Sequence, residues 1–373
     1  MTQSKSGAGL RGQSAGETAL CTVGKEGTGL TYRGYDVRDL ARQCEFEEVA
    51  YLLLYGELPN RAELDAYKRR LASLRELPPA AKSVLEQIPR DAHPMDVMRT
   101  GCSMLGTLET ETDFSQQGDV ADRLLAVFPS IITYWYRYSH DGVRIDTDSD
   151  EDSIGAHFLY LLRGERPNEL HKNVMHVSLI LYAEHEFNAS TFAARVCAST
   201  LSDMHSAITG AIGTLRGPLH GGANEAAMEM LEQWTTPEEA RQGLRGMFER
   251  KEKVMGFGHA IYKEVDPRNA VIKEWSRQLA EEVGDTTLFP VSEAVEQLMW
   301  DEKGLFANAD FYHASAYRFM GIPTKLFTPI FVMSRHSGWA AHVMEQRAKN
   351  RIIRPSADYV GHELRPVPAI DER

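Results

Sequence analysis

Helical sequence patterns follow one another along most of this chain, and this feature limits its possible folds more than any other. Apolar residues recur three and four positions apart over long stretches, the spacing that one face of a helix requires. The clearest helix start is Thr236, Pro237 and Glu239, which supply an N-cap, a first-turn proline and a capping-box glutamate. The segments expected to be helical are 45–55, 61–76, 79–88, 94–106, 119–139, 153–163, 168–186, 190–215, 222–234, 237–253, 267–283, 291–302, 310–320 and 328–348.

Strand signals are confined to the N-terminal region. Residues 19–22 and 29–33 flank a glycine-containing turn and are expected to form one short β-hairpin. Strands do not alternate with helices along the chain, which argues against a parallel sheet of the α/β class. We therefore predict an all-α protein with one short N-terminal β-hairpin.

The size and composition are those of a soluble globular protein that is large enough for two domains. The chain has 373 residues, of which 43% are hydrophobic and 25% are charged. Its longest apolar stretch, 124–138, contains Pro129 and is shorter than the roughly 20 residues that a membrane helix needs. Residues 1–20 lack the apolar core of a secretion signal. With four scattered cysteines and no metal-binding spacing among them, we expect a cytoplasmic protein with reduced thiols.

The net charge of −12 argues against nucleic acid as the main partner. It also means that an anionic substrate would be repelled by the protein as a whole. A site for such a substrate must therefore concentrate arginine locally. The C-terminal part of the chain does this, with one acidic residue, Glu345, among five basic ones: Arg335, Arg347, Lys349, Arg351 and Arg354.

Two segments resemble ligand-binding motifs but do not satisfy them. The acidic segment 146–152 suggests a calcium loop, yet Glu151 stands where the loop glycine is required and His157 where the bidentate glutamate belongs. The sequence GFGHAI at 256–261 begins like a dinucleotide-binding turn, but it lacks the third glycine and follows no strand. We therefore predict no metal site and no dinucleotide site.

The first segment that points to chemistry is GPLHGGAN at 217–224. Pro218 ends one helix, and the two glycines that follow His220 allow a tight turn into the next helix. A histidine at the positive end of a helix dipole is disfavoured as imidazolium, so a neutral ring could offer its N–H to a carbonyl oxygen. A histidine that only caps a corner between two helices would explain the same pattern.

The second segment is GFGHAIYKEVDPR at 256–268. Its two glycines allow a ligand to approach His259 closely. Asp266 and Pro267 are expected to be the N-cap and first residue of a helix, with Arg268 in its first turn. A cation there opposes the helix dipole, and a bound anion would remove the conflict. The alternative is an arginine that faces solvent.

The third segment is GLFANADFYH at 304–313. Asp310 lies in it among mostly apolar residues, with no basic neighbour in sequence. A carboxylate in apolar surroundings becomes more basic, as a general base requires. An ordinary carboxylate in the first turn of a helix would look the same in the sequence.

Together and in this order, the three segments resemble the citrate synthase family. The shared motifs are Gly-Pro-x-His-Gly-Gly-x-Asn, then Gly-x-Gly-His with Asp-Pro-Arg, then Asn-x-Asp, and the resemblance covers nearly the whole chain. It implies a large helical domain, 1–220 with 323–373, and a smaller helical domain, 221–322. It also implies a homodimer with shared active sites, which condenses an acyl-CoA thioester with oxaloacetate.

The resemblance assigns roles to the residues above. Asp310 would remove a proton next to the thioester carbonyl, His220 would hydrogen-bond the enol oxygen, and His259 would polarise the oxaloacetate carbonyl. No metal and no redox cofactor is implied, since the CoA thioester is itself a substrate. The residues that would contact oxaloacetate are His185, Arg268, Arg335 and Arg354, the last from the partner subunit, and those that would contact CoA phosphates are Lys263 and Lys303. The flanking glutamates of His185 would equally suit a packed helix histidine, and both lysines suit an exposed surface.

Within the family, the chain is most similar to the bacterial 2-methylcitrate synthases. The similarity rests on segments such as HPMDVMRTG at 93–101 and AEHEFNASTF at 183–192, and it implies propionyl-CoA as the preferred partner of oxaloacetate, with acetyl-CoA as a weaker substrate. Many relatives have Ser-Gly after Asp-Phe-Tyr, whereas this chain has His313 and Ala314. The rivals are a citrate synthase that uses acetyl-CoA and a helical binding protein without catalysis.

Overall fold

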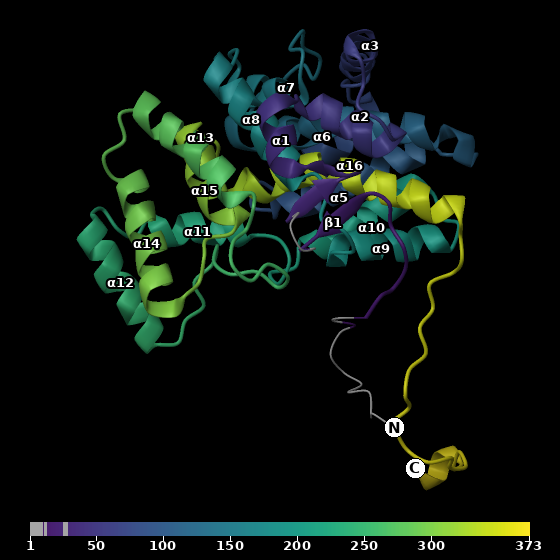
Figure 1. Cartoon of the computed structure of the whole chain (residues 1–373). Coiled ribbons are helices and arrows are strands. Elements are labelled where there is room, and N and C mark those ends of the chain that lie inside the picture. The colour runs from purple at the N-terminus through teal and green to yellow at the C-terminus, as the bar shows by residue number, and fades with distance from the viewer. Residues whose placement is uncertain (1–9, 11–12, 25–28) are drawn as a thin grey trace.

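The computed structural model describes residues 10, 13–24 and 29–373, and these residues are predominantly helical, as predicted. Eleven of the sixteen α-helices in the described part of the chain gather in one large body (Figure 1). They are α1 (Val37–Gln43), α2 (Phe46–Tyr55), α3 (Arg61–Ala72), α4 (Pro79–Glu86), α5 (Pro94–Leu108), α6 (Gln117–Tyr136), α7 (Ile154–Arg163), α8 (Glu169–Tyr182), α9 (Ala189–Ser199), α10 (Met204–Leu215) and α16 (Phe327–Ala348). No helix in the described residues is both long and apolar enough to cross a membrane.

The predicted N-terminal hairpin is present, and it is extended by a third strand that the sequence did not predict. Strands β1 (Cys21–Val23) and β2 (Leu30–Tyr32) pair antiparallel, and β2 also pairs with the short strand β3 (Tyr35–Asp36). The sheet is tied to the helices by Tyr32, which is fully buried and donates its hydroxyl to the carbonyl oxygen of Ile180 at 2.9 Å.

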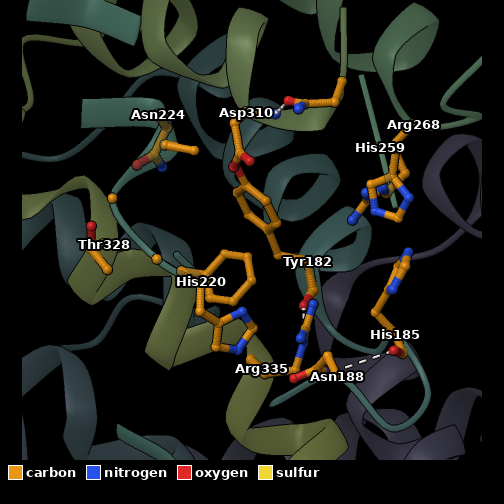
Figure 2. A pocket seen from close by; sticks show the side chains of 15 residues that line it. Tyr182, His185, Asn188, His220, Asn224, His259, Arg268, Asp310, Thr328 and Arg335 are labelled. Atoms are coloured by element: carbon orange, nitrogen blue, oxygen red, sulfur yellow. Dashed lines mark hydrogen bonds between the residues drawn. The ribbon is translucent and has the colours of Figure 1, made fainter. Parts of the chain in front are cut away.

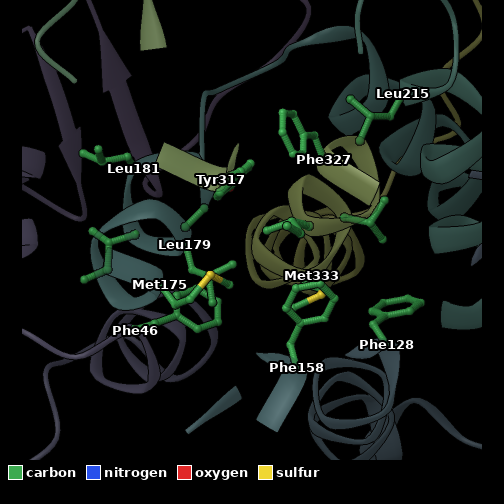
Figure 3. Close-up of a cluster of buried hydrophobic side chains, with 14 of the residues drawn as sticks. Phe46, Phe128, Phe158, Met175, Leu179, Leu181, Leu215, Tyr317, Phe327 and Met333 are labelled. Carbon is green, nitrogen blue, oxygen red and sulfur yellow. The ribbon is translucent and has the colours of Figure 1, made fainter. Parts of the chain in front are cut away.

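Helix α16 is the centre of the large body. Most of its residues are buried, and it packs against α2, α5, α6, α8, α9 and α10. Its polar side chains Arg335, His336 and His342 are buried together with the apolar ones, so the helix lies inside the protein. Figure 3 shows Phe327 and Met333 of α16 together with side chains from neighbouring helices, of which Phe46, Phe128, Phe158, Met175, Leu179, Leu181, Leu215 and Tyr317 are labelled. This packing holds the middle of α16 against the C-terminal end of α8.

The remaining five helices lie together beside the large body (Figure 1). They are α11 (Ala223–Leu231), α12 (Pro237–Glu249), α13 (Asn269–Glu282), α14 (Leu288–Lys303) and α15 (Ala309–Phe319). Helix α15 packs against α11 and α13, and α12 packs against α14. They touch the large body where α11 meets α16 and where α8 meets α13 and α15. The division at 221–322 stays a prediction, with which this arrangement is consistent.

Several helix boundaries differ from the sequence prediction. The helix expected over 168–186 ends at Tyr182, so His185 lies in the loop beyond it. The segment 190–215 forms two helices, because Leu201 adopts a positive φ of 66° and Asp203 caps a new start at α10. Helix α1 was not predicted at all. It begins at the N-cap Asp36, whose side chain accepts from the backbone N–H of Arg38.

The close approach of α16 to the end of α8 depends on Gly338. A Cβ at this position would overlap the carbonyl oxygen of Ala183 and a carboxylate oxygen of the buried Glu184. We expect Gly338→Ala to lower the free energy of unfolding in urea by about 1–3 kcal/mol, the usual cost of overpacking.

The matched control is Gly118→Ala in α6, where an added Cβ would meet only the Tyr55 ring at ordinary contact distance. That variant should stay within about 0.5 kcal/mol of wild type, as a surface substitution does. Equal losses in the two variants would contradict the proposed close packing of α16.

Candidate active site

A small cavity and a wider cleft meet where α8, α11, α15 and α16 come together. The cavity measures about 150 Å³ and the cleft about 560 Å³. Both are lined by His185, His220, His259 and Asp310, and the cavity also by Arg268 and Arg335. Figure 2 shows these side chains around one space, although they come from parts of the chain up to 150 residues apart. The structure thus brings together six of the nine residues that the sequence singled out.

His220 is held as a neutral ring whose Nδ1 carries the proton. The turn that carries it ends at Gly222, the N-cap of α11, which has a positive φ of 81°. The backbone N–H of Ser190 donates to His220 Nε2 at 3.2 Å, which makes Nε2 the acceptor in that contact, and Ser190 Oγ lies 2.7 Å from the same nitrogen. Burial, and then the charge of Arg335, lowers the His220 pKa to about 4. The ring therefore offers an Nδ1–H donor at neutral pH.

His259 is neutral for the same reasons, but with the proton on the other nitrogen. Its Nδ1 accepts from the backbone N–H groups of Ile261 at 3.1 Å and Tyr262 at 3.3 Å. The loop is shaped by Gly256 and Gly258, which have positive φ angles of 87° and 69°. Burial, followed by the charge of Arg268, lowers the His259 pKa to about 4. The free donor of His259 is thus Nε2–H.

Arg268 is placed differently from the sequence prediction. It is the N-cap of α13 and not a residue of its first turn, because the helix begins at Asn269. Its Nε and one terminal nitrogen donate to the two carboxylate oxygens of Asp266 at 2.9 and 2.8 Å. The arginine is neither solvent-facing nor dependent on a ligand for a counter-charge, since both side chains are buried. Burial alone would raise the Asp266 pKa, but Arg268 outweighs it and holds that pKa below its usual value.

Arg335 and His185 complete the polar side of the cavity. Arg335 is 2% exposed and uses Nε on the carbonyl oxygen of Tyr182 at 2.7 Å. Among the described residues, its two terminal nitrogens have no hydrogen-bond partner, and the cavity is in front of them. His185 pairs through Nε2 with the Tyr262 hydroxyl at 3.1 Å, and burial holds its pKa well below the usual value. The site therefore contains two arginines and a neutral histidine.

Asp310 is a half-buried carboxylate at the start of α15. The N-cap Asn308 accepts from the Asp310 backbone N–H at 3.0 Å and fixes the first turn. The Tyr182 hydroxyl donates to Asp310 Oδ1 at 2.5 Å. Burial raises the Asp310 pKa more than this hydrogen bond lowers it. The carboxylate is consequently more basic than an ordinary aspartate, as its apolar sequence context suggested.

Three residues named from the sequence do not line the cavity or the cleft. Arg354 is exposed in the segment that leaves the large body after α16 (Figure 1), and Lys263 is exposed as well. Lys303 is exposed at the end of α14, with its Nζ 4.2 Å from the centre of the Phe248 ring. The lysine that lines the cleft is Lys253.

Sequence reasoning missed the residues that hold the predicted ones. Tyr182 fixes Asp310 and Arg335, Ser190 fixes the His220 tautomer, and Asn188 is the N-cap of α9 that turns the chain away from the cavity. Of these, only Asn188 had a usable signal, an N-cap residue before a helical pattern. The others act across long sequence separations that one sequence does not reveal.

The acidic and histidine side chains that come closest to a metal-ligating arrangement in the described residues are Glu45, Glu47 and His176. They are not in the cleft. Lys68 already donates to Glu45, and the backbone N–H of Phe46 donates to His176 Nδ1. Glu45 and His176 thus have partners within the protein itself. Glu47 accepts from the Ile154 backbone N–H through Oε1, while its Oε2 is buried without a hydrogen-bond partner among the described residues.

The chain is similar to citrate synthases over nearly its whole length. The family model described as citrate synthase, C-terminal domain, matches residues 9–356. A 2-methylcitrate synthase from Shewanella oneidensis is 71% identical over 98% of this chain and 98% of the relative. Citrate synthase 2 from Bacillus subtilis is 43% identical over 92% and 93%. The solved citrate synthase of Thermoplasma acidophilum, a ternary complex with carboxymethyl coenzyme A and oxaloacetate, has a TM-score of 0.89 at 32% identity over 97% and 98%.

The contribution of the buried Asp266–Arg268 pair to stability can be compared with that of a similar pair on the surface. Asp36 and Arg38 make the same three hydrogen bonds, from the arginine N–H, Nε and terminal nitrogen, but the Arg38 side chain is 48% exposed. Asp266→Asn should lower the free energy of unfolding by about 3–5 kcal/mol, because it leaves a buried guanidinium unpaired. Asp36→Asn should cost less than about 1 kcal/mol.

The stability lost in Asp266→Asn should depend on pH, and the Asp266 pKa gives the direction of that dependence. Because the Asp266 pKa is lowered in the folded protein, its contribution is present above the usual aspartate value of about 3.9 and disappears as the pH falls through the folded value. The difference between wild type and Asp266→Asn should therefore narrow in acid. Unfolding curves at pH 7 and at about pH 3, below the usual aspartate pKa, measure this, and a gap that does not narrow at the lower pH would contradict the assignment.

Proposed function

The chain belongs to the citrate synthase family, and on that premise we propose that it condenses propionyl-CoA with oxaloacetate and releases 2-methylcitrate and CoA. The observation that carries the proposal is one cavity lined by two neutral histidine donors and one basic carboxylate, His220, His259 and Asp310. Proton abstraction next to a carbonyl needs one base and at least one donor for the developing oxyanion. These three groups supply both.

Oxaloacetate would bind against Arg268, Arg335 and His185. The terminal nitrogens of Arg335 face the cavity, and Arg268 keeps one terminal nitrogen that its pair with Asp266 does not use. Planar guanidinium groups suit carboxylates because they present paired N–H donors. The neutral His185 adds a hydrogen bond without a further charge.

The reaction would proceed in three steps. Asp310 takes a proton from the carbon next to the thioester carbonyl, while His220 Nδ1–H stabilises the enol oxygen. The enol carbon then attacks the keto carbon of oxaloacetate, and His259 Nε2–H gives its proton to the new alkoxide. The proton that Asp310 took is released to solvent, and His259 regains one from solvent, which restores both groups. Water finally cleaves the thioester, which forms a carboxylic acid and CoA thiol. Only protons and a carbon nucleophile move, so the proposal calls for no redox or metal cofactor.

Parts of the proposed site come from both groups of helices. His259 and Asp310 belong to the proposed small domain, 221–322, while His185 and Arg335 belong to the remainder. Closure of one group on the other would then bring base and oxaloacetate together and exclude water. CoA would lie along the cleft, where Lys253 is present, with its phosphates near the exposed Lys263 and Lys303.

The charge of the cavity supports a homodimer that shares its active sites. Arg268 is paired with Asp266, and the charge of Glu184, which is fully buried, opposes the effect of burial on the Arg335 pKa. Both cavity arginines thus already have an acidic neighbour, so a further cation from a second chain would add to the positive charge that faces the two carboxylates of oxaloacetate. Arg354 lies on an exposed segment from which it could enter the cavity of a second copy. The proposed location is the cytoplasm, which fits four unpaired cysteines.

The first test is CoA-thiol release from propionyl-CoA and from acetyl-CoA, each with and without oxaloacetate. The substrates differ by one methylene, which a pocket resolves by only about 1–3 kcal/mol, or roughly 10- to 200-fold in kcat/KM. We expect release to require oxaloacetate and kcat/KM to be higher with propionyl-CoA. A higher value with acetyl-CoA would make the enzyme a citrate synthase, and no oxaloacetate-dependent release would refute catalysis.

A mixing experiment tests the base and the shared site together. Asp310→Asn alone should lower turnover by about 10²–10⁴-fold, and Arg354→Ala alone should also be strongly impaired. When the two variants are co-expressed, a mixed dimer contains one site with an intact Asp310 and the partner's intact Arg354. About a quarter of the wild-type activity should therefore return if subunits pair at random. No recovery would mean that Arg354 serves its own chain or neither chain.

A further inference from the structure

His313 and Tyr182 form a buried pair behind the proposed base, and neither has a part in the chemistry described above. His313 lies three residues after Asp310 on α15, so both side chains are on the same side of the helix. It is fully buried, and its ring centre is 4.1 Å from that of Tyr182, with the two planes 30° apart. Tyr182 is 1% exposed and reaches Asp310 with its hydroxyl.

We propose that Tyr182 is a positioning residue that keeps the base Asp310 ionised, and that His313 acts on Asp310 only by holding the Tyr182 ring in place. The inference rests on the proposed function, in which Asp310 is the base. Three observations carry it: the 2.5 Å hydrogen bond to Asp310, the ring contact with His313, and the hydrogen bonding of His313 itself.

Tyr182 is fixed at both of its polar ends. Its hydroxyl donates to Asp310 Oδ1, and its carbonyl oxygen accepts from Arg335 Nε at 2.7 Å. The Phe331 ring closes its other side at 4.4 Å between ring centres. One residue thus connects the base with the arginine that would hold oxaloacetate. The hydroxyl leaves Asp310 Oδ2 as the oxygen that is open to a substrate proton.

The hydroxyl of Tyr182 favours the ionised form of Asp310. A donor to a carboxylate stabilises the anion, and it does so more strongly where water is excluded. Burial raises the Asp310 pKa, and the Tyr182 hydrogen bond is the largest effect in the opposite direction. The tyrosine stays protonated, because burial and the Asp310 charge hold its own pKa well above the usual value. Without this donor, the base would be protonated over a wider range of pH.

His313 does not act on Asp310 through charge. Burial lowers its pKa to about 3, so the ring is neutral wherever the enzyme works. Its Nδ1 is 2.6 Å from the carbonyl oxygen of Ala309 and donates to it, while Nε2 is buried with no hydrogen-bond partner among the described residues. That one hydrogen bond fixes the plane of the ring against Tyr182. His313 therefore restricts the movement of the Tyr182 ring by packing against it.

Other charged and titratable groups also face Asp310 and set the background on which Tyr182 acts. They are Arg268 and Asp266 before α13, Arg335 on α16, Tyr317 on α15, and the cavity histidines His220 and His259. The two histidines are neutral above about pH 5, as their pKa values of about 4 indicate. None of these groups is altered by a substitution of Tyr182 that only removes its hydroxyl.

The test is the pH profile of kcat/KM for propionyl-CoA at saturating oxaloacetate. Tyr182→Phe should move the acid limb of this profile upward by about 1–2 pH units, the effect of losing one hydrogen bond to a charged group. The rate should recover toward that of wild type at high pH, where Asp310 is ionised in both proteins. A merely structural role would lower the whole profile and leave the acid limb unmoved, and that result would overturn the proposal.

Two further variants test whether His313 works through Tyr182. His313→Ala should shift the acid limb in the same direction but by less, and His313→Phe, which restores a ring, should bring it back toward wild type. The double variant Tyr182→Phe/His313→Ala should show no more shift than Tyr182→Phe alone. Shifts that add in full would overturn the part assigned to His313.

Tyr317→Phe is the matched control. Tyr317 is also a fully buried tyrosine, but its hydroxyl pairs with Ser178 Oγ at 2.5 Å and not with the base. Tyr317→Phe should lower the stability of the protein without moving the acid limb of the kcat/KM profile. A shift of the acid limb equal to that of Tyr182→Phe would overturn the role assigned to Tyr182.

Failure of the proposed function is distinguishable from failure of this inference. If wild type releases no thiol, the carboxyl band of Asp310 can still be titrated by infrared difference spectroscopy, with Asp310→Asn to assign the band. A higher band pKa in Tyr182→Phe supports the inference without any turnover. An unchanged band pKa refutes it.

Discussion

The buried ion pair between Asp266 and Arg268 fixes one wall of the cavity, and the geometry of the site depends on it. Asp266 holds the guanidinium that faces the cavity and also accepts from the backbone N–H of Ala309, the residue before Asp310. One carboxylate thus sets the position of an anion-binding cation and the start of the helix that carries the base. Because the pair is withdrawn from water, removing either partner leaves an unpaired charge where solvent does not compensate it.

The same burial sets opposite protonation states around the cavity. It makes His220 and His259 neutral, and it makes Asp310 more basic than a surface aspartate. Burial disfavours whichever form is charged, which is the protonated form for histidine and the ionised form for aspartate. Two hydrogen-bond donors and one base can therefore coexist at neutral pH, and Tyr182 limits how far the Asp310 pKa rises.

The sequence was sufficient for the fold class, because helical periodicity is recorded locally. The residues that line the cavity were singled out only when the family resemblance was added to their local patterns. Helical periodicity and capping residues mark most helices, and glycines mark the turns at His220 and His259. It was insufficient where distant segments decide the outcome. The end of α8 at Tyr182 and the burial of the Asp266–Arg268 pair follow from packing against other helices, although the pairing itself is local and recurs at Asp36 and Arg38. Tyr182 itself lies 128 positions from Asp310, and its sequence context is that of any buried helix.

The course of the backbone influences which nitrogen of each proposed catalytic histidine carries the proton. The groups that make His220 Nε2 and His259 Nδ1 acceptors are backbone N–H groups, of Ser190, Ile261 and Tyr262. Every amino acid except proline carries such a group. The side chains of Ile261 and Tyr262 can therefore change without changing which nitrogen of His259 donates. Ser190 differs, because its Oγ also lies 2.7 Å from His220 Nε2, so that position depends on its side chain as well as on the course of the backbone.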